Sequence, residues 1–162
     1  MAELYNICLD IGVTKILGAV FNSKKEIVYR LKKKTKAGGD TSTNVEEVII
    51  SVVKELIDLA GIKIDQIHSI AAGAPGVINQ ETGVVLFSPN LPWKNYNIRK
   101  PIEDVFKAPF YIGNDVNVGV LGEYRYGAAK GYSNVVGLFV GTGMGGGLIL
   151  DGKLYTGNQF KA

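Results

Sequence analysis

The alternation of hydrophobic and polar residues predicts three strands near the N-terminus. Apolar side chains recur in residues 5–11, 15–22 and 26–35, and polar residues separate these segments. Segments of this length with a period of two are typical of half-buried strands. The connections at 12–14 and 22–25 are short and polar, which favours antiparallel neighbours. We therefore expect the chain to begin with an antiparallel three-stranded unit.

The pattern then changes to a helical period. Between Val45 and Ala60, apolar residues recur at the 3.6-residue spacing of an amphipathic helix. Thr43 and Glu46 fit a capping box at its start, and Gly61 stands where such a helix ends. Many of the apolar residues are β-branched, which lowers their helix propensity. We therefore expect packing against a sheet, rather than propensity, to hold this helix.

The rest of the chain alternates strands, helices and turns. The predicted segments are a strand at 67–74 ending in Gly73-Ala74-Pro75-Gly76, a hairpin of 77–79 with 84–87, a loop at 88–93, a helix at 98–106, a strand at 110–113, a helix at 115–126, and strands at 135–140, 147–150 and 154–155. The order is βββαβ, a hairpin insert, αβα and a new run of hairpin strands. It predicts an α/β fold with a mixed sheet covered by helices.

Two domains are expected from this order. We assign residues 1–117 to the first domain and residues 118–162 to the beginning of a second. The last strands would not be stable alone, because an isolated hairpin is at best marginally stable in water. We therefore expect the chain to be the N-terminal portion of a longer protein.

The composition is that of an ordinary soluble domain. Hydrophobic residues make up 46% and charged residues 20% of the 162 residues, and a net charge of +3 gives no reason to expect a nucleic-acid partner. The single cysteine, Cys8, excludes an internal disulfide, and its apolar neighbours favour a buried thiol. There is no signal-peptide pattern and no apolar run of about 20 residues, so we expect a cytoplasmic protein without a membrane partner.

A glycine-rich segment at 141–147 carries the strongest chemical signal. Five of its seven residues are glycine, and Gly141, Gly143 and Gly146 match G-x-G-x-x-G. In a dinucleotide-binding site that motif opens a helix, whereas here a strand and a hairpin turn follow. No Gly-Lys-Ser/Thr follows, so the segment is not a P-loop. A plain structural turn is one interpretation, but the entropy cost of so many glycines favours a turn that a ligand approaches closely.

A second polar turn lies far upstream, between the first two predicted strands. It contains Asp10, Gly12, Thr14 and Lys15. Taken alone, an ordinary hairpin is an equally good interpretation. A carboxylate, however, suits a hydrated magnesium ion, and a threonine hydroxyl with backbone N–H groups suits phosphate oxygens. Two such turns in one chain predict a clamp on the phosphates of a nucleotide.

Three further side chains have both a structural and a functional interpretation. Asp115 follows a predicted strand, where it either caps the next helix or serves as a general base. Trp93 either lines a pocket for a polar substrate or anchors its own loop. His68 is expected to be exposed or satisfied, and one histidine provides no metal site.

Together these segments resemble the ROK family (repressors, open reading frames and sugar kinases), within the actin/hexokinase/Hsp70 superfamily. The matching segments occur in family order over almost the whole chain: Asp10-Ile11-Gly12-Val13-Thr14-Lys15-Ile16, Gly73-Ala74-Pro75-Gly76, Ser88-Pro89-Asn90-Leu91-Pro92-Trp93, Gly113-Asn114-Asp115-Val116-Asn117 and Gly141-Thr142-Gly143-Met144-Gly145-Gly146-Gly147. The combination is highly specific, although each segment alone is not. The sequence is most similar to the glucokinase-like sugar kinases of the family.

The resemblance implies a fold, an activity and a set of site residues. It implies a ribonuclease-H-like domain, a related second domain, and a hexose, most directly glucose, phosphorylated by ATP with Mg²⁺ in the cleft between them. Asp115 matches the catalytic base. The matches to phosphate-binding positions are Asp10, Gly12, Thr14, Lys15, Gly141, Thr142 and Gly143, with the magnesium ion near Asp10. The matches to sugar-binding positions are Gly76, Asn90, Asn114 and Asp115. A homo-oligomer is implied for the full-length protein.

The sequence also departs from the family pattern. Val13 stands where the first phosphate motif usually has a second glycine, a change that a negative φ would tolerate. The Glu-x-Gly-His motif, the cysteine-rich zinc site and the adenine site of the family are all expected beyond Ala162, so the chain alone is expected to be inactive. The alternatives are a kinase for fructose, mannose or an N-acetyl amino sugar, and a sugar-sensing regulator without catalysis. The lack of a helix-turn-helix before the first strand favours a kinase.

Overall fold

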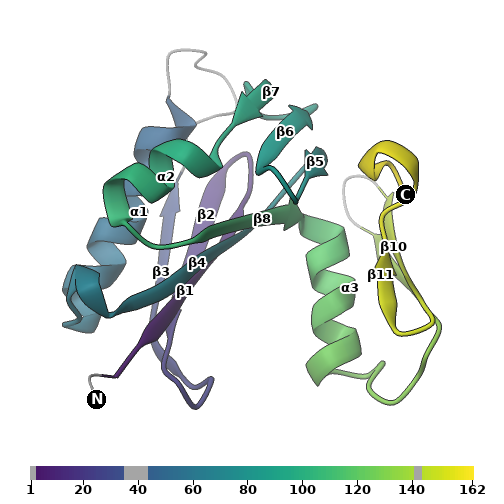
Figure 1. The fold of residues 1–162 in the computed structure, drawn as a ribbon, viewed down its shortest axis with the longest axis horizontal. Helices are drawn as coiled ribbons and strands as arrows, with labels where there is room; N and C mark the ends of the chain where they lie inside the picture. The colour runs from purple at the N-terminus through teal and green to yellow at the C-terminus, as the bar shows by residue number, and fades with distance from the viewer. Residues whose placement is uncertain (1–2, 35–43, 141–143) are drawn as a thin grey trace.

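The computed structural model describes residues 3–34, 44–140 and 144–162, and its main element is a five-stranded mixed sheet (Figure 1). The strands are β1 (Tyr5–Ile11), β2 (Lys15–Phe21), β3 (Ile27–Lys34), β4 (Ile67–Ala74) and β8 (Phe110–Asn114), in the order β3-β2-β1-β4-β8. The first three form the predicted antiparallel unit, and β4 and β8 run parallel to β1. The carboxyl ends of β1, β4 and β8 therefore meet at one edge of the sheet.

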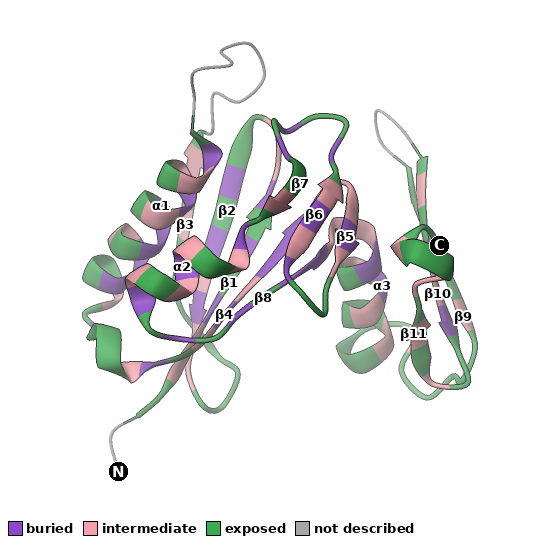
Figure 2. Cartoon of the chain, turned by 45° about the horizontal axis from the view of Figure 1, so that its top comes forward, coloured by how far each residue is buried: buried purple, intermediate pink, exposed green. Residues whose placement is uncertain are grey.

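Helices α1 (Val45–Ala60) and α2 (Arg99–Phe106) form the layer that buries one face of this sheet. Figure 2 shows buried residues concentrated beneath the two helices. Helix α1 packs on β2 and β3 at close range, because a Cβ placed on Gly18 would lie only 2.6 Å from Cδ1 of Leu56. This packing stabilises a helix that is rich in β-branched residues, as the sequence predicted.

The start of α1 differs from the prediction, whereas its end agrees. The N-cap is Asn44, whose side-chain oxygen accepts a hydrogen bond from the backbone N–H of Glu46 at 3.2 Å. The predicted capping residue, Thr43, lies outside the described residues. At the other end, Gly61 takes a left-handed conformation with φ 65° and closes the helix.

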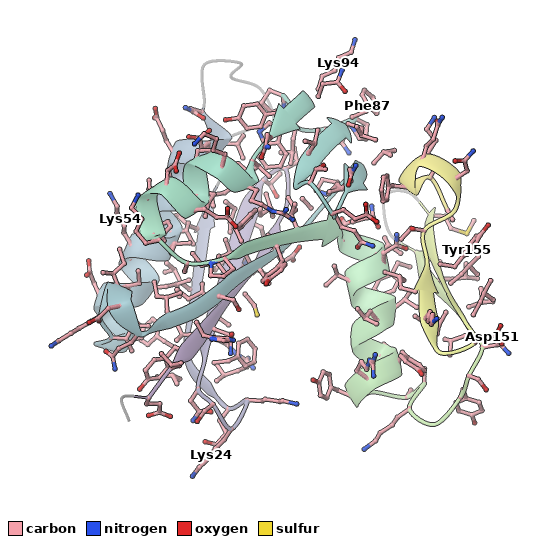
Figure 3. The ribbon with its side chains drawn as sticks, in the orientation of Figure 1. Lys24, Lys54, Phe87, Lys94, Asp151 and Tyr155 are labelled. Atoms are coloured by element: carbon pink, nitrogen blue, oxygen red, sulfur yellow. The ribbon has the colours of Figure 1, made fainter. Side chains whose placement is uncertain are left out.

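A small three-stranded sheet is inserted between β4 and α2. Its strands are β5 (Val77–Asn79), β6 (Val84–Phe87) and β7 (Lys94–Asn97), in that order. The first two are the predicted hairpin. Strand β7 was not predicted, because its residues, Lys-Asn-Tyr-Asn, do not alternate between apolar and polar. Phe87 and Lys94, which pair across β6 and β7, lie at the outer end of this sheet (Figure 3).

Arg99 fastens the inserted sheet to the body of the protein. Its Nε atom donates a hydrogen bond to the carbonyl oxygen of Phe110 at 3.0 Å. Its two terminal nitrogens donate to the carbonyl oxygens of Glu81 and Gln80 at 2.6 and 2.9 Å. One guanidinium therefore joins the β5–β6 turn to β8, which uses the fixed fork of donors that only arginine supplies.

Helix α3 (Asp115–Tyr126) leads from β8 to a second small sheet. Its strands are β9 (Val135–Val140), β10 (Met144–Leu150) and β11 (Lys153–Tyr155), in the order β11-β10-β9. Figure 1 shows α3 beside this sheet and away from α1 and α2. Strand β10 begins three residues earlier than predicted, because its first residues include glycines that have no side chain to show a pattern. Short 3₁₀ turns occur at Ile64–Gln66 and Asn158–Phe160.

The structure corrects the prediction for Cys8 and decides the one for Trp93. Cys8 is exposed, because Ile7 and Leu9 point into the core and the intervening side chain of a strand points to the opposite face. Trp93 is buried and stacks on Tyr96, with ring centroids 6.3 Å apart. It therefore anchors its own loop. None of the helices in the described ranges is long and apolar enough to cross a bilayer.

Candidate active site

The shared edge of β1, β4 and β8 brings the predicted site residues together. In the strand register Asp10 lies beside Gly73, and Gly73 lies beside Gly113. Adjacent strands are about 4.8 Å apart, so these ends are all within roughly 10 Å of one another. Asp115 follows directly at the start of α3, and a Cβ on Gly73 would lie 3.4 Å from its Cα atom. Asp115 therefore lies directly over the end of β4.

The segment predicted to be the first phosphate turn connects β1 and β2. The backbone N–H of Gly12 donates to the carbonyl oxygen of Lys15 at 2.9 Å. Thr14 and Lys15 are exposed at this turn, so both side chains are available to a ligand. Val13 is not among the residues with positive φ, so the departure from the family's second glycine causes no backbone strain.

The start of α3 fixes both Asn114 and Asp115. Asn114, and not Asp115 as predicted, is the N-cap, and its Oδ1 atom accepts from the backbone N–H of Asn117 at 3.0 Å. Its Nδ2 atom donates to the carbonyl oxygen of Gly76 at 3.1 Å. Asp115 is the first helical residue, and its Oδ1 atom accepts from the backbone N–H of Val116 at 2.9 Å. Because Asn114 caps the helix, the second carboxylate oxygen of Asp115 is not needed for capping.

The charge of Asp115 acts on the carboxyl group of Asp10. Partial burial raises the pKa of Asp10, the negative charge of Asp115 raises it further, and the positive charge of Lys15 opposes both. Two neighbouring carboxylates are hard-oxygen ligands of the kind that a hydrated magnesium ion prefers. The residues present therefore fit a magnesium ion held next to Asp10. In the described part of the chain, no three His, Cys, Asp or Glu side chains gather into a metal cluster.

The electrostatics of Asp10 lead to a stability prediction. Because the pKa of Asp10 is raised above 3.8 in the folded state, folding stability falls as the pH rises from about 3.8 through that raised value. Asp10→Asn should therefore increase the free energy of unfolding at about pH 7. The gain should be less than about 1 kcal/mol, because the side chain is exposed and water screens its charge. Urea denaturation at about pH 7 and about pH 3 tests this, and an equal gain at both pH values would contradict it.

The predicted sugar-binding residues lie on two connected segments. Gly76 has φ 129° and accepts the hydrogen bond from Asn114, so these two residues are in direct contact. Asn90 is exposed in the next loop, which is closed by a hydrogen bond from the backbone N–H of Ser88 to the carbonyl oxygen of Trp93 at 3.1 Å. Within the described residues no hydrogen bond joins Asn90 to Asn114. The structure thus brings together Gly76, Asn114 and Asp115, and leaves Asn90 separately exposed.

The second predicted phosphate turn falls between β9 and β10. Gly141, Thr142 and Gly143 themselves lie outside the described residues. The strands on either side pair antiparallel, with Val140 opposite Met144, so the three residues connect the two strands of a hairpin. His68, the only histidine, is exposed on β4, as expected.

The sequence did not reveal the packing role of two motif residues. Asn117 is 7% exposed, and its Oδ1 atom has no hydrogen-bond partner among the described residues. Ser88 is 5% exposed and its hydroxyl is likewise without a partner in the described ranges. Both residues belong to segments that the family resemblance singled out. The sequence showed only that each is a polar residue in such a segment. The burial of Ser88 and Asn117 depends on which residues pack against them, and the sequence does not reveal that.

Comparison with known proteins places the chain in a family. The ROK family model matches residues 6–161. A xylose repressor from Caldicellulosiruptor bescii is 35% identical over 155 residues, which cover 93% of this chain and 38% of the repressor. A glucokinase from Streptomyces coelicolor is 31% identical over 152 residues, which cover 94% of this chain and 45% of that enzyme. The solved ROK family glucokinase from Streptomyces griseus, in complex with glucose and AMPPNP, has a TM-score of 0.81 and 30% identity, covering 95% of this chain and 47% of its own.

The chain belongs to the ROK family, because the family model covers nearly all of it. Its mixed α/β fold is the ribonuclease-H-like fold shared with ROK sugar kinases, as predicted. The family includes both sugar kinases and repressors, as these relatives illustrate. The chain spans less than half the length of each of these relatives, between 38% and 47%.

Proposed function

We propose that the full-length protein containing this chain is an ATP-dependent hexose kinase and that glucose is its substrate. The observation that carries the proposal is the meeting of Asp10, Asn114 and Asp115 at the carboxyl ends of β1 and β8. This is the edge at which α/β proteins place their ligands. The similarity to glucokinases from two Streptomyces species supports both the reaction and the sugar.

In the proposed reaction, Asp115 is the catalytic base. Its carboxylate takes the proton from the sugar hydroxyl while that oxygen attacks the γ-phosphorus of ATP, and the bond from that phosphorus to the bridging oxygen breaks, which releases ADP. Asn114, Gly76 and Asn90 hold the sugar hydroxyls. The hydrogen bond between Asn114 and the carbonyl oxygen of Gly76 supports this assignment, because it joins the start of the helix that carries Asp115 to a residue proposed to bind the sugar.

The two turns hold the phosphates in this proposal. Gly12, Thr14 and Lys15 contribute from the β1–β2 turn, and the assignment of Gly141, Thr142 and Gly143 rests on the family resemblance. Asp10 holds the magnesium ion, which when bound neutralises charge on the phosphate oxygens. Most of the reduction in the barrier then comes from alignment and charge neutralisation, as is general for phosphoryl transfer.

We further propose the domain arrangement expected from the sequence. Residues 1–117 form the first domain and residues 118–162 begin the second. The β1-β2-β3 and β9-β10-β11 units support this, because each is an antiparallel three-stranded meander with a proposed phosphate turn between its first two strands. A cytoplasmic location and a homo-oligomeric full-length protein are part of the same proposal.

Two alternatives remain as proposals of the same family. One is a kinase whose sugar is fructose, mannose or an N-acetyl amino sugar. The other is a sugar-sensing regulator, which the 35% identity to a xylose repressor favours. The presence of Asp115 together with both proposed phosphate turns favours a kinase.

A coupled assay of ADP release by the full-length protein tests the proposal. We expect ADP release that depends on a hexose, with glucose giving the highest kcat/KM in a panel that includes mannose, fructose, N-acetylmannosamine and xylose. Preference for another hexose would replace glucose as the substrate. Binding of a sugar by calorimetry without ADP release would instead identify a regulator.

A further inference from the structure

Helix α3 packs on the second sheet at a distance that only glycine permits. A Cβ on Gly145 would lie 2.6 Å from Cγ2 of Val116, and a Cβ on Gly147 would lie 2.9 Å from Cγ2 of Val120. A Cβ on Gly137 of β9 would also collide with Val120. Real Cβ atoms essentially never approach other atoms within 3.0 Å. Glycines of the glycine-rich segment therefore serve close helix packing as well as any turn.

The contact of α3 with the first sheet is looser. A Cβ on Gly73 would meet Asp115 at 3.4 Å, which is ordinary van der Waals contact. On Gly113 it would meet Cγ2 of Val118 at 3.0 Å. The second sheet also packs a side chain closely against a glycine of the helix, because a Cβ on Gly119 of α3 would lie 2.7 Å from the ring of Phe139. Helix α3 therefore makes its closest contacts with the second sheet.

Asn117 gives independent evidence that this contact is set by more than stability. Its side chain is more than nine-tenths buried, and within the described residues its Oδ1 atom has no partner. That atom points at the backbone of β10, because a Cβ on Gly147 would lie 3.0 Å from it. A buried acceptor without a partner costs free energy, and native structures contain few of them. The helix is thus held against β10 even though one of its polar groups is left unsatisfied.

We infer that Gly145 and Gly147 are positioning residues that make α3 and β10 one rigid unit. Asp115, at the first turn of α3, then keeps a fixed position relative to the start of β10. The close packing of α3 on β10 follows from these contacts alone. Its consequence for catalysis rests on the proposed function, because it needs Asp115 to be the base.

Hydrogen exchange of the 162-residue chain tests the packing. Gly145→Ala should raise the exchange rates of backbone amides in the first turns of α3 and in β10 by at least about tenfold, with β1 and β4 unchanged. The matched control is Gly122→Ala on α3 itself, because a Cβ there would meet nothing within 4 Å. The double variant Gly145→Ala/Val116→Ala should restore protection, since it removes the methyl group that the new Cβ would meet. Unchanged exchange in Gly145→Ala would overturn the inference.

Kinetics of the full-length protein test the positioning role. Gly145→Ala should lower kcat by about tenfold or more with little change in the KM for sugar, because misplacement affects the transition state more than ground-state binding. The double variant should recover kcat, and Gly122→Ala should keep it. If Gly145→Ala raised hydrogen exchange but kept a normal kcat, the positioning role would be overturned and Gly145 would serve packing alone. A wild-type protein without turnover would instead overturn the proposed function, and the exchange experiment would still decide whether α3 and β10 form one unit.

Discussion

In the full-length protein, Asp115→Asn should lower the kcat of hexose phosphorylation by about 10²–10⁴-fold, because an amide does not accept the proton that the sugar hydroxyl releases. The change keeps the size of the side chain, and an amide oxygen can still accept the hydrogen bond from the backbone N–H of Val116. The helix start should therefore be preserved, because Asn114 remains its cap. ADP release at saturating sugar measures kcat, and calorimetry with the sugar alone measures binding.

Asp104→Asn is the matched control for this prediction. Asp104 is an exposed carboxylate on α2 whose partner is Lys100, at 2.9 Å. Water screens an exposed helical pair of this kind, so it contributes little to stability and the variant should fold and turn over normally. If Asp115→Asn kept its turnover, another group would have to be the base. If both variants lost activity equally, the loss would come from general damage to the protein.

The strands and helices could largely be predicted, because most carry a clear period. The helix from Val45 to Ala60 and the meander of β1, β2 and β3 have the expected bounds to within about two residues. Strand β7 and the first part of β10 could not be predicted for a physical reason. Polar residues such as Lys94 and glycines such as Gly145 give no alternation, and their strands form because a neighbouring strand is already in place.

The sequence could predict which residues form the candidate site, but not how these residues are arranged in space. Asn114 and Asp115 are both good N-caps, and sequence alone cannot place the helix start to within one residue. The register of β4 with β8 decides it, because β8 runs on to Asn114 beside Ala74. The glycines at 145 and 147 were interpreted as part of a ligand turn. The structure adds a second role, since their missing side chains admit α3.

The conformation of Gly76 leads to the largest expected effect on stability. Its φ of 129° lies in a region that residues with a side chain rarely adopt. In addition, a Cβ there would collide with the carbonyl oxygen of Phe87 and lie 3.0 Å from Cα of Ser88, and backbone atoms cannot move aside cheaply. Gly76→Ala should therefore lower the free energy of unfolding of the 162-residue chain by about 3 kcal/mol or more. Urea denaturation followed by circular dichroism measures this loss.

Gly61→Ala separates the two contributions to this loss of stability, which are the positive φ and the collision of the new Cβ. Gly61 also has a positive φ, at 65°, but a Cβ there would meet nothing within 4 Å. This variant should lose only about 1–2 kcal/mol, the cost of a left-handed conformation. The difference between the two alanine variants measures the collision with the backbone of Phe87 and Ser88. Equal losses would mean that the backbone of Phe87 and Ser88 moves aside freely. The hydrogen bond from Asn114 to the carbonyl oxygen of Gly76 would then not hold Gly76 in a fixed position.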